Sequence, residues 1–347
     1  QQQQQLEQQL ELALGSGAPL QWHQVMDPLQ RMGERLRWSW GVVSHLNGVC
    51  NSPELREAHA AQQAAVVQFG NRAGQSRVIY KELEQLQQQG AELDGAQQRI
   101  LAAELRDMQL RGVGLSGSEQ EAFNSASQEL AELSTRFGNQ VLDATNGWTL
   151  KLTEREQVDG LPASLLDQLA QAARQAGDSE ATAEAGPWLL GLDMPRYAPF
   201  LKYSRRRDLR EQVYRAHVSR ASGQAGSELN NWPLIERILT LRGEQAKRLG
   251  YANWAEVSLA AKMADSEAAV EALLEELRAA AYPVAQQELE ALAACASRQG
   301  AAEAADLQPW DVSFWAEKLR QESFELDSEA LRPYFPLPQV LEGLFAL

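Results

Sequence analysis

The sequence predicts a mainly α-helical protein with one small β element around residues 148–193. Three observations favour this fold class. Alanine, glutamine, leucine and glutamate, which are all good helix formers, dominate the 347 residues. Apolar residues recur three, four or seven positions apart over long stretches, as they do on one face of an amphipathic helix. Strand signals, in contrast, are confined to two short runs.

Residues 1–146 are expected to form a first set of helices. The glutamine-rich start carries Leu6, Leu10 and Leu14 four positions apart, which is compatible with a helix. The helices are interrupted where glycine, proline or asparagine gather, at Asn51–Pro53, 90–95 and 112–117.

A second helical pattern follows the last of these breaks. Ser118 and Glu121 have the spacing of a capping box, in which hydroxyl and carboxylate satisfy unpaired amides at a helix start. One helix face is then marked by apolar residues at helical spacing, namely Phe123, Leu130, Leu133, Phe137 and Val141.

The segment 147–202 carries both strand signals. Trp148–Leu152 alternates large and polar residues, and Trp188–Leu192 is a short apolar run. A helical pattern follows the Gly-Leu-Pro turn at 160–162, between the two runs. We therefore expect one small β element, with a helix between its strands, inside a helical protein.

Residues 203–347 return to long helices. Ser266 followed by Glu267 places a hydrogen-bond acceptor and then a negative charge at a helix start. The helix face after it carries Val270, Leu273, Leu274, Leu277 and Val284. Nearer the end, an apolar stripe without an evident partner predicts a surface that something covers: Val340, Leu341, Leu344, Phe345 and Leu347.

The chain is acidic, with a formal net charge of −15. Such a chain repels phosphate backbones and anionic membranes, so we expect no nucleic-acid or membrane partner. The one dense basic run comprises Arg205, Arg206, Arg207 and Arg210. We interpret it as a solvated helix start that pairs with nearby acids such as Asp208 and Glu211; anion binding is the alternative.

Cys50 and Cys295 lie far apart in apolar or alanine-rich helical contexts. Two idle thiols in a reducing compartment are the expected state, and a disulfide is the alternative. The first residues lack the basic and apolar regions of a secretory signal. These observations favour the cytoplasm.

A search for zinc chemistry finds no HExxH motif. That motif works because two histidines four residues apart share one helix face and reach the metal, while the glutamate activates water. The chain has four histidines (His23, His45, His59 and His217), and none lies within four residues of another. We therefore predict no catalytic, cofactor-binding or metal-binding residue; a site assembled from scattered residues is the alternative.

Residues 112–117 read GVGLSG and match the GxGxxG pattern of dinucleotide-binding loops. That fingerprint requires a preceding β-strand, whereas the residues before this one have helical spacing. The segment is therefore interpreted as a glycine-rich connection between two helices. The sequence also lacks a Walker A loop, an EF-hand loop and a GxSxG elbow.

Several runs, taken in order, resemble one known family. They include Trp38–Ala58, Leu115–Trp148, Arg196–Ala216, Leu241–Ala264 and, near the end, LQPWDVSFW and LRPYFP. Together they are similar to the thimet oligopeptidase family of zinc metallopeptidases, and within it to the oligopeptidase A branch better than to the dipeptidyl carboxypeptidases. The resemblance extends from about residue 22 to the end.

This resemblance implies a two-lobed helical metallopeptidase architecture around a channel that admits short unstructured peptides. It implies one zinc ion, held by an HExxH helix and a downstream glutamate, and a monomer. It also implies three regions: an N-terminal helical domain at 1–146, a connector of short strands and a helix at 147–202, and the start of the peptidase domain at 203–347. The family's zinc ligands and catalytic residues have no counterpart in these 347 residues.

The leading hypothesis is therefore the N-terminal portion of a zinc-dependent oligopeptidase that degrades short peptides, inactive in the form given. In this hypothesis zinc belongs to the longer protein, and this chain binds none. A non-catalytic helical module that binds a peptide or a partner is the first alternative. A purely structural helical scaffold is the second, although it leaves the family-like runs unexplained.

Overall fold

The computed structural model describes residues 2–16, 21–89, 93–223, 228–325 and 331–346. The chain divides into two compact units, each made of two stretches. Unit 1 comprises 1–139 and 232–273, and unit 2 comprises 140–231 and 274–347. The chain leaves unit 1 inside helix α6 and leaves it again inside helix α12. Each unit is described by itself below.

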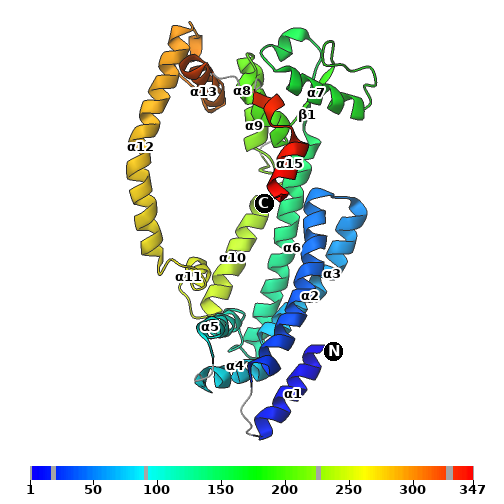
Figure 1. The fold of residues 1–347 in the computed structure, drawn as a ribbon, viewed down its shortest axis with the longest axis vertical. Helices are drawn as coiled ribbons and strands as arrows, with labels where there is room; N and C mark the ends of the chain where they lie inside the picture. Colours follow the sequence, from blue (N-terminus) through cyan, green and yellow to red (C-terminus); the bar gives the residue numbers. More distant parts are fainter. Residues whose placement is uncertain (1, 17–20, 90–92, 224–227, 326–330, 347) are drawn as a thin grey trace. The chain divides into compact units, whose positions relative to one another are not determined.

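Unit 1 is built from helices (Figure 1). They are α1 (Gln2–Ser16), α2 (Trp22–Val49), α3 (Pro53–Gly74), α4 (Arg77–Gln89), α5 (Gly95–Leu110), most of α6 (Gly117–Gly147), α10 (Trp232–Arg248) and α11 (Trp254–Leu259). Polar side chains mark the helix starts: the Ser52 hydroxyl accepts from the Leu55 amide, and Pro53 follows as the first helical residue, where its missing amide costs nothing.

The core of unit 1 joins α1, α2, α4 and α5. In α4, Ile79, Leu83 and Leu86 are spaced by four and three residues and are all buried. They pack with Leu6 and Leu10 of α1 in one hydrophobic cluster, which also takes in residues of α2 and α5. The glutamine-rich start is thus a helix, and Leu6 and Leu10 of its predicted apolar face are buried. The side chain of Leu14, the third leucine of that face, lies outside the described residues.

Helix α10 belongs to unit 1 although more than eighty residues separate it from the end of α6. Its Arg237 donates two hydrogen bonds, of 2.6 and 2.7 Å, to the carboxylate of Glu129 in α6. The Gln245 side-chain amide donates to the Ser127 hydroxyl at 2.8 Å. These hydrogen bonds hold α10 against α6.

Unit 2 contains the two strands, β1 (Thr149–Leu152) and β2 (Trp188–Gly191), paired antiparallel with Thr149 opposite Gly191 and Leu152 opposite Trp188. Its helical segments are η1 (Arg155–Val158), α7 (Ala163–Gln175), α8 (Met194–Tyr203), α9 (Arg207–Val218), most of α12 (Glu267–Arg298), η2 (Ala302–Ala305), α13 (Pro309–Phe324), η3 (Arg332–Tyr334) and α15 (Leu337–Phe345). Buried residues of β1, β2, α7, α8 and α9 form one core.

The predicted fold class is confirmed: the chain is mainly helical, and its small sheet lies where both strand signals fall. Residues 112–117 connect α5 to α6, so the GVGLSG segment follows a helix, as expected. Ser266 accepts a hydrogen bond from the Ala269 amide at the start of α12. Helix α6 begins at Gly117, which places Ser118 inside its first turn. Both cysteines are free thiols, Cys50 exposed and Cys295 buried.

The predicted three-part division of the chain stays a prediction. Among the described residues, no helix is both long enough and apolar enough to cross a membrane.

One apolar pattern predicted from the sequence is exposed in the structure. Leu273, Leu274, Leu277 and Val284 of α12 are between 51 and 59% exposed, although their spacing is that of a helix face that packs.

Candidate functional site

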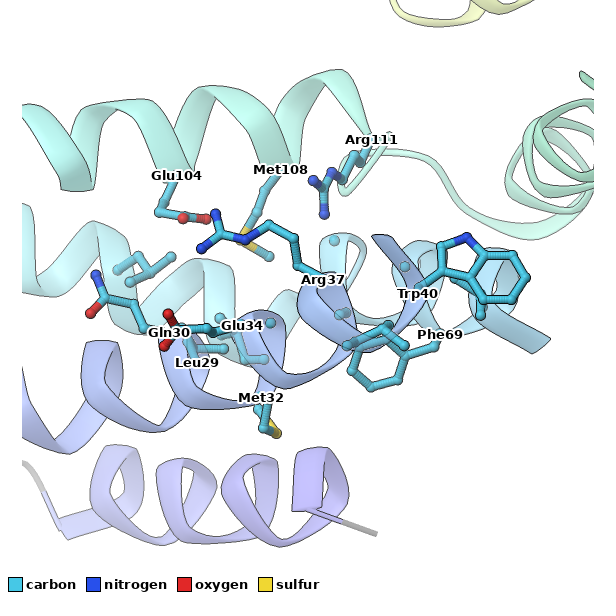
Figure 2. A pocket seen from close by; sticks show the side chains of 18 residues that line it. Leu29, Gln30, Met32, Glu34, Arg37, Trp40, Phe69, Glu104, Met108 and Arg111 are labelled. Atoms are coloured by element: carbon cyan, nitrogen blue, oxygen red, sulfur yellow. The ribbon is translucent and has the colours of Figure 1, made fainter. Parts of the chain in front are cut away.

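Unit 1 contains a cleft of about 750 Å³ formed by α2, α3, α4 and α5 (Figure 2). Most pockets that bind small molecules or peptide side chains fall within roughly 300–1,000 Å³, so its size suits a ligand. The cleft has an apolar floor, an aromatic end and charged walls, which are described in turn below.

Helix α2 supplies the longest side of the cleft. Leu29, Met32, Leu36 and Trp40 follow one another at intervals of three, four and four, and therefore share one helix face. Opposite them, Met108 of α5 and the buried core residues of α4 complete the apolar floor. The two methionines offer flexible, polarisable surface that adapts to differently shaped apolar groups.

The aromatic end is held in place by a histidine. The Trp40 and His59 rings stack with centroids 4.5 Å apart, and His59 is 5% exposed. Burial lowers the pKa of His59, which keeps the ring neutral. Its Nε2 lies 3.4 Å from the Ser44 hydroxyl. Together with Phe69 of α3, Trp40 forms an aromatic wall (Figure 2).

The charged walls come from α2 and from α5 with the residue after it. Glu34 and Arg37 lie on α2, Glu104 lies on α5, and Arg111 caps the end of α5. Figure 2 shows the Arg37 side chain extended toward the α5 wall, where Glu104 and Arg111 lie. Desolvation raises the pKa of Glu104, and the positive charge of Arg111 opposes that rise. The cleft thus offers both cations and carboxylates above an apolar floor.

Gly74 makes room for Arg111. A Cβ placed on Gly74, at the end of α3, would collide with the Arg111 side chain. The absence of that atom lets the arginine lie against α3 and reach the cleft, so the glycine serves close packing rather than an unusual backbone angle.

The basic run of the sequence is found in unit 2, and one part of its interpretation is wrong. Arg206 does pair with Asp208 at the surface, as expected. Arg207 and Arg210, however, both pair with Asp311 of α13, each at 2.8 Å, and Arg210 is 1% exposed. Arg210 is therefore a core residue and not part of a solvated face.

The remaining donors of the Arg210 guanidinium are also used. Its Nη1 donates to the Ser204 carbonyl at 2.8 Å, and its Nε donates to the Trp310 carbonyl at 3.2 Å. Burial opposes ionisation of Asp311, but hydrogen bonds from Arg207 and Arg210 outweigh it and hold the pKa of Asp311 below its ordinary range. These bonds join α9 to α13, so we interpret Arg210 and Asp311 as structural residues.

The four histidines do not form a metal site. His23 and His45 are exposed on α2, and His59 stacks on Trp40. His217, in unit 2, stacks on Tyr197 with centroids 3.9 Å apart. In the part of the chain that the structure describes, no group of three His, Cys, Asp or Glu side chains could hold a metal ion. The residues present do not fit the zinc that the resemblance implies.

Comparison with known proteins gives two family matches, in order along the chain. Residues 1–120 match the model of the neurolysin/thimet oligopeptidase N-terminal domain. Residues 200–347 match the model of peptidase family M3. Over these two stretches the chain is similar to peptidase family M3.

Within the family the chain is similar to oligopeptidase A proteins. It is 43% identical to the probable cytosolic oligopeptidase A of Arabidopsis thaliana, over 99% of this chain and 49% of the relative. It is 43% identical to the organellar oligopeptidase A of the same plant, over 94% of this chain and 41% of the relative. It is 36% identical to oligopeptidase A of Escherichia coli, over 97% and 49%. The chain spans about half the length of these relatives.

Proposed function

We propose that this chain is the N-terminal portion of a zinc-dependent oligopeptidase that hydrolyses short, unstructured peptides. The observation that carries the proposal is the ordered pair of family matches together with relatives named oligopeptidase A. Identities of 36–43% over nearly the whole chain support the same function for the longer protein.

In this proposal the 347 residues form part of the framework of the peptidase and contain none of its catalytic residues. A zinc ion held by an HExxH helix would polarise a peptide carbonyl and activate water, and the sequence contains no such motif. The chain by itself is therefore inactive. The three regions 1–146, 147–202 and 203–347 remain our proposed division into N-terminal domain, connector and start of the peptidase domain.

The proposed setting is a monomer in the cytoplasm, with short peptides as its substrates and no nucleic-acid or membrane partner. Two free thiols suit a reducing compartment. Among the relatives, one is named cytosolic and another is named chloroplastic/mitochondrial, so the compartment needs its own test by fractionation of the source cells.

A direct test compares two forms of the protein. The natural protein, isolated from its source, should cleave a short quenched-fluorescence peptide and lose that activity when a chelator removes the metal. The 347-residue chain should cleave nothing under the same conditions. Chelator-sensitive cleavage by this chain alone would refute its inactivity, and no cleavage by the natural protein would refute the peptidase function.

The cleft of unit 1 favours a second candidate function, that of a module that binds peptides without cleaving them. Arg37 and Arg111 suit a carboxylate, Glu34 and Glu104 suit an amine, and the floor suits an apolar side chain. Titration of a labelled hydrophobic tripeptide with free termini tests it. Saturable binding that Arg37→Ala weakens, with no cleavage by the natural protein, would favour the module.

A further inference from the structure

Unit 1 contains another pocket, of about 550 Å³, between α4, the connection from α5 to α6, and the end of α10. We call it the α4–α10 pocket. It shares no lining residue with the cleft described above. The connection carries the glycine-rich GVGLSG segment, to which the proposed function gives no role. The charged residues of the lining are Arg77, Lys81, Glu84 and Arg248.

Helix α4 contributes two of the cations from one face. Arg77 and Lys81 lie four residues apart and therefore share a side of the helix, and both are exposed. The core residues Ile79, Leu83 and Leu86 lie on the opposite side and are buried. The apolar face of α4 thus belongs to the core, while its basic face forms one wall of the α4–α10 pocket.

The end of α5 and the connection after it bring further hydrogen-bonding groups to this wall. The Arg77 Nη2 donates to the Leu115 carbonyl at 3.1 Å, and the Gln109 side-chain amide donates to the Tyr80 hydroxyl at 2.7 Å. Because the Tyr80 oxygen accepts that bond, its own proton is available to a ligand. The amide of Gly114, which also lines the pocket, has no hydrogen-bond partner among the described residues.

The third cation, Arg248, is already compensated. Its Nε lies 3.1 Å from a carboxylate oxygen of Glu119, and its Nη1 lies 3.5 Å from one of Glu244. Arg77 and Lys81 differ, because neither has a carboxylate within ion-pair distance in the part of the chain that the structure describes. The lining therefore offers a ligand two cations that no acidic side chain neutralises.

Two unpaired cations on one face match a group with two negative charges. A phosphate monoester carries a charge of about −1.5 to −2 at neutral pH and three acceptor oxygens, whereas a carboxylate carries a single charge. Arginine and lysine both bind phosphate oxygens, and hydrogen bonds between charged groups are the stronger ones. The net charge of −15 disfavours polyanions, but at physiological salt charges act over only about 8 Å, so a single phosphate group responds to the nearby cations.

We propose that the α4–α10 pocket binds a small phosphate monoester whose phosphoryl group Arg77 and Lys81 hold. The Tyr80 hydroxyl and the Gly114 amide are further donors for the phosphate oxygens, and the Glu84 carboxylate accepts from a hydroxyl of the organic part. A volume of about 550 Å³ has room for that organic part. The inference goes beyond the proposed function and does not depend on it. Sugar phosphates and nucleoside monophosphates share this chemistry, and the test separates them.

The test titrates the 347-residue chain with glucose 6-phosphate and, separately, with adenosine monophosphate, by isothermal titration calorimetry at constant ionic strength. Glucose and adenosine are the matching probes without phosphate. The variant Arg77→Gln/Lys81→Gln removes both cations of the wall. The control Arg31→Gln/Arg35→Gln removes two exposed arginines with the same spacing on α2, outside the pocket.

Circular dichroism and thermal melting of each chain establish that the variants fold as the wild type does. If the double variant does not fold, Lys81→Gln alone takes its place, because the Lys81 ammonium has no partner to lose among the described residues.

The wild type and the control should bind at least one of the two phosphate esters saturably and with equal affinity. The double variant should bind that ester at least about tenfold more weakly, because it loses charged hydrogen bonds to the phosphate oxygens. Whichever ester binds more tightly identifies the organic part. Three outcomes would each overturn the proposal: no saturable binding of either ester, undiminished binding by the pocket variant, or equally tight binding of the probe without phosphate.

Discussion

Glu82 is a buried acidic residue of unit 1. It is fully buried in α4, and neither carboxylate oxygen has a hydrogen-bond partner among the described residues. Burial raises the pKa of Glu82 above its ordinary value. A buried polar group without a partner costs about 1–3 kcal/mol, and apolar replacement removes that cost.

We therefore expect Glu82→Met to stabilise the chain by about 1–3 kcal/mol at neutral pH. The Glu82 carboxyl binds its proton more tightly in the folded state than in the unfolded state, so ionised Glu82 destabilises the wild type most above the folded-state pKa. The stability difference between Glu82→Met and the wild type should therefore shrink as the pH falls through that pKa. Urea titration at several pH values measures it, with the exposed Gln85→Met as control. A wild type more stable than the variant at neutral pH would contradict the expectation.

Asp311 presents the opposite case, a buried carboxylate whose partners are both present. Removal of one member of a buried ion pair costs about 3–5 kcal/mol, because the remaining charges lose their compensation. Asp311→Ala should destabilise the chain by that amount in urea. Asp208→Ala, which removes a carboxylate from the surface pair with Arg206, should cost at most about 1 kcal/mol. Similar losses of stability in Asp311→Ala and Asp208→Ala would refute the difference between the buried and the surface ion pair.

The pH dependence of Asp311 follows from its lowered pKa. The contribution of this carboxylate to stability is complete above the ordinary aspartate pKa and is lost as the pH falls through the folded-state value. The wild type should therefore lose more stability in acid than Asp311→Ala does, as measured by thermal melting over an acidic pH series. Parallel acid profiles would contradict this role.

Sequence reasoning could not reach this cluster. Arg207 and Arg210 are three residues apart on a helix, and the nearest acids in the chain are Asp208 and Glu211. The true partner, Asp311, is about one hundred residues away, and only tertiary packing brings it close. A motif search likewise finds no site residues in the unit 1 cleft, because its lining comes from four helices that are separate in the sequence. The helical spacing of Leu29, Met32, Leu36 and Trp40 is the one signal that could have indicated its apolar side.

At the scale of elements, the sequence was more informative. Alternation located β1, a short apolar run located β2, and the breaks at Asn51–Pro53 and 112–117 located helix boundaries. These signals act over a few neighbouring residues. The apolar face of α12 was also predicted, but its exposure was not. Periodicity shows which face of a helix is apolar and cannot show whether a partner covers it.

Helix α5 carries one wall of the cleft, and its start depends on one side chain. The Asp94 carboxylate accepts hydrogen bonds of 2.8 Å from the Ala96 and Gln97 amides, and the Gln97 side chain accepts from the Asp94 amide at 3.0 Å. Asp94→Ala should cost about 1 kcal/mol, and Asp94→Asn should cost less because it retains an acceptor. Hydrogen exchange at the first amides of α5 measures the change. Unchanged protection in Asp94→Ala would contradict the capping role.

At the scale of the whole molecule, the described residues hold no group of metal ligands. A ligand that binds the folded state raises the melting temperature in proportion to the logarithm of its concentration over its dissociation constant. Neither added zinc chloride nor a chelator should therefore change the melting temperature of this chain. A zinc-dependent rise that the chelator reverses would reveal a metal site within these residues.

The contacts between α6 and α10 have a consequence for synthesis. Glu129 leaves the ribosome 108 residues before its partner Arg237. At a synthesis rate of roughly 5–20 residues per second, Arg237 is added on the order of 5–20 s after Glu129. Meanwhile the strands and α7, all in the intervening stretch, have already been made. Unit 1 therefore begins first and finishes later than the sheet, and the unsatisfied face of α6 is the surface that a chaperone would meet during that interval.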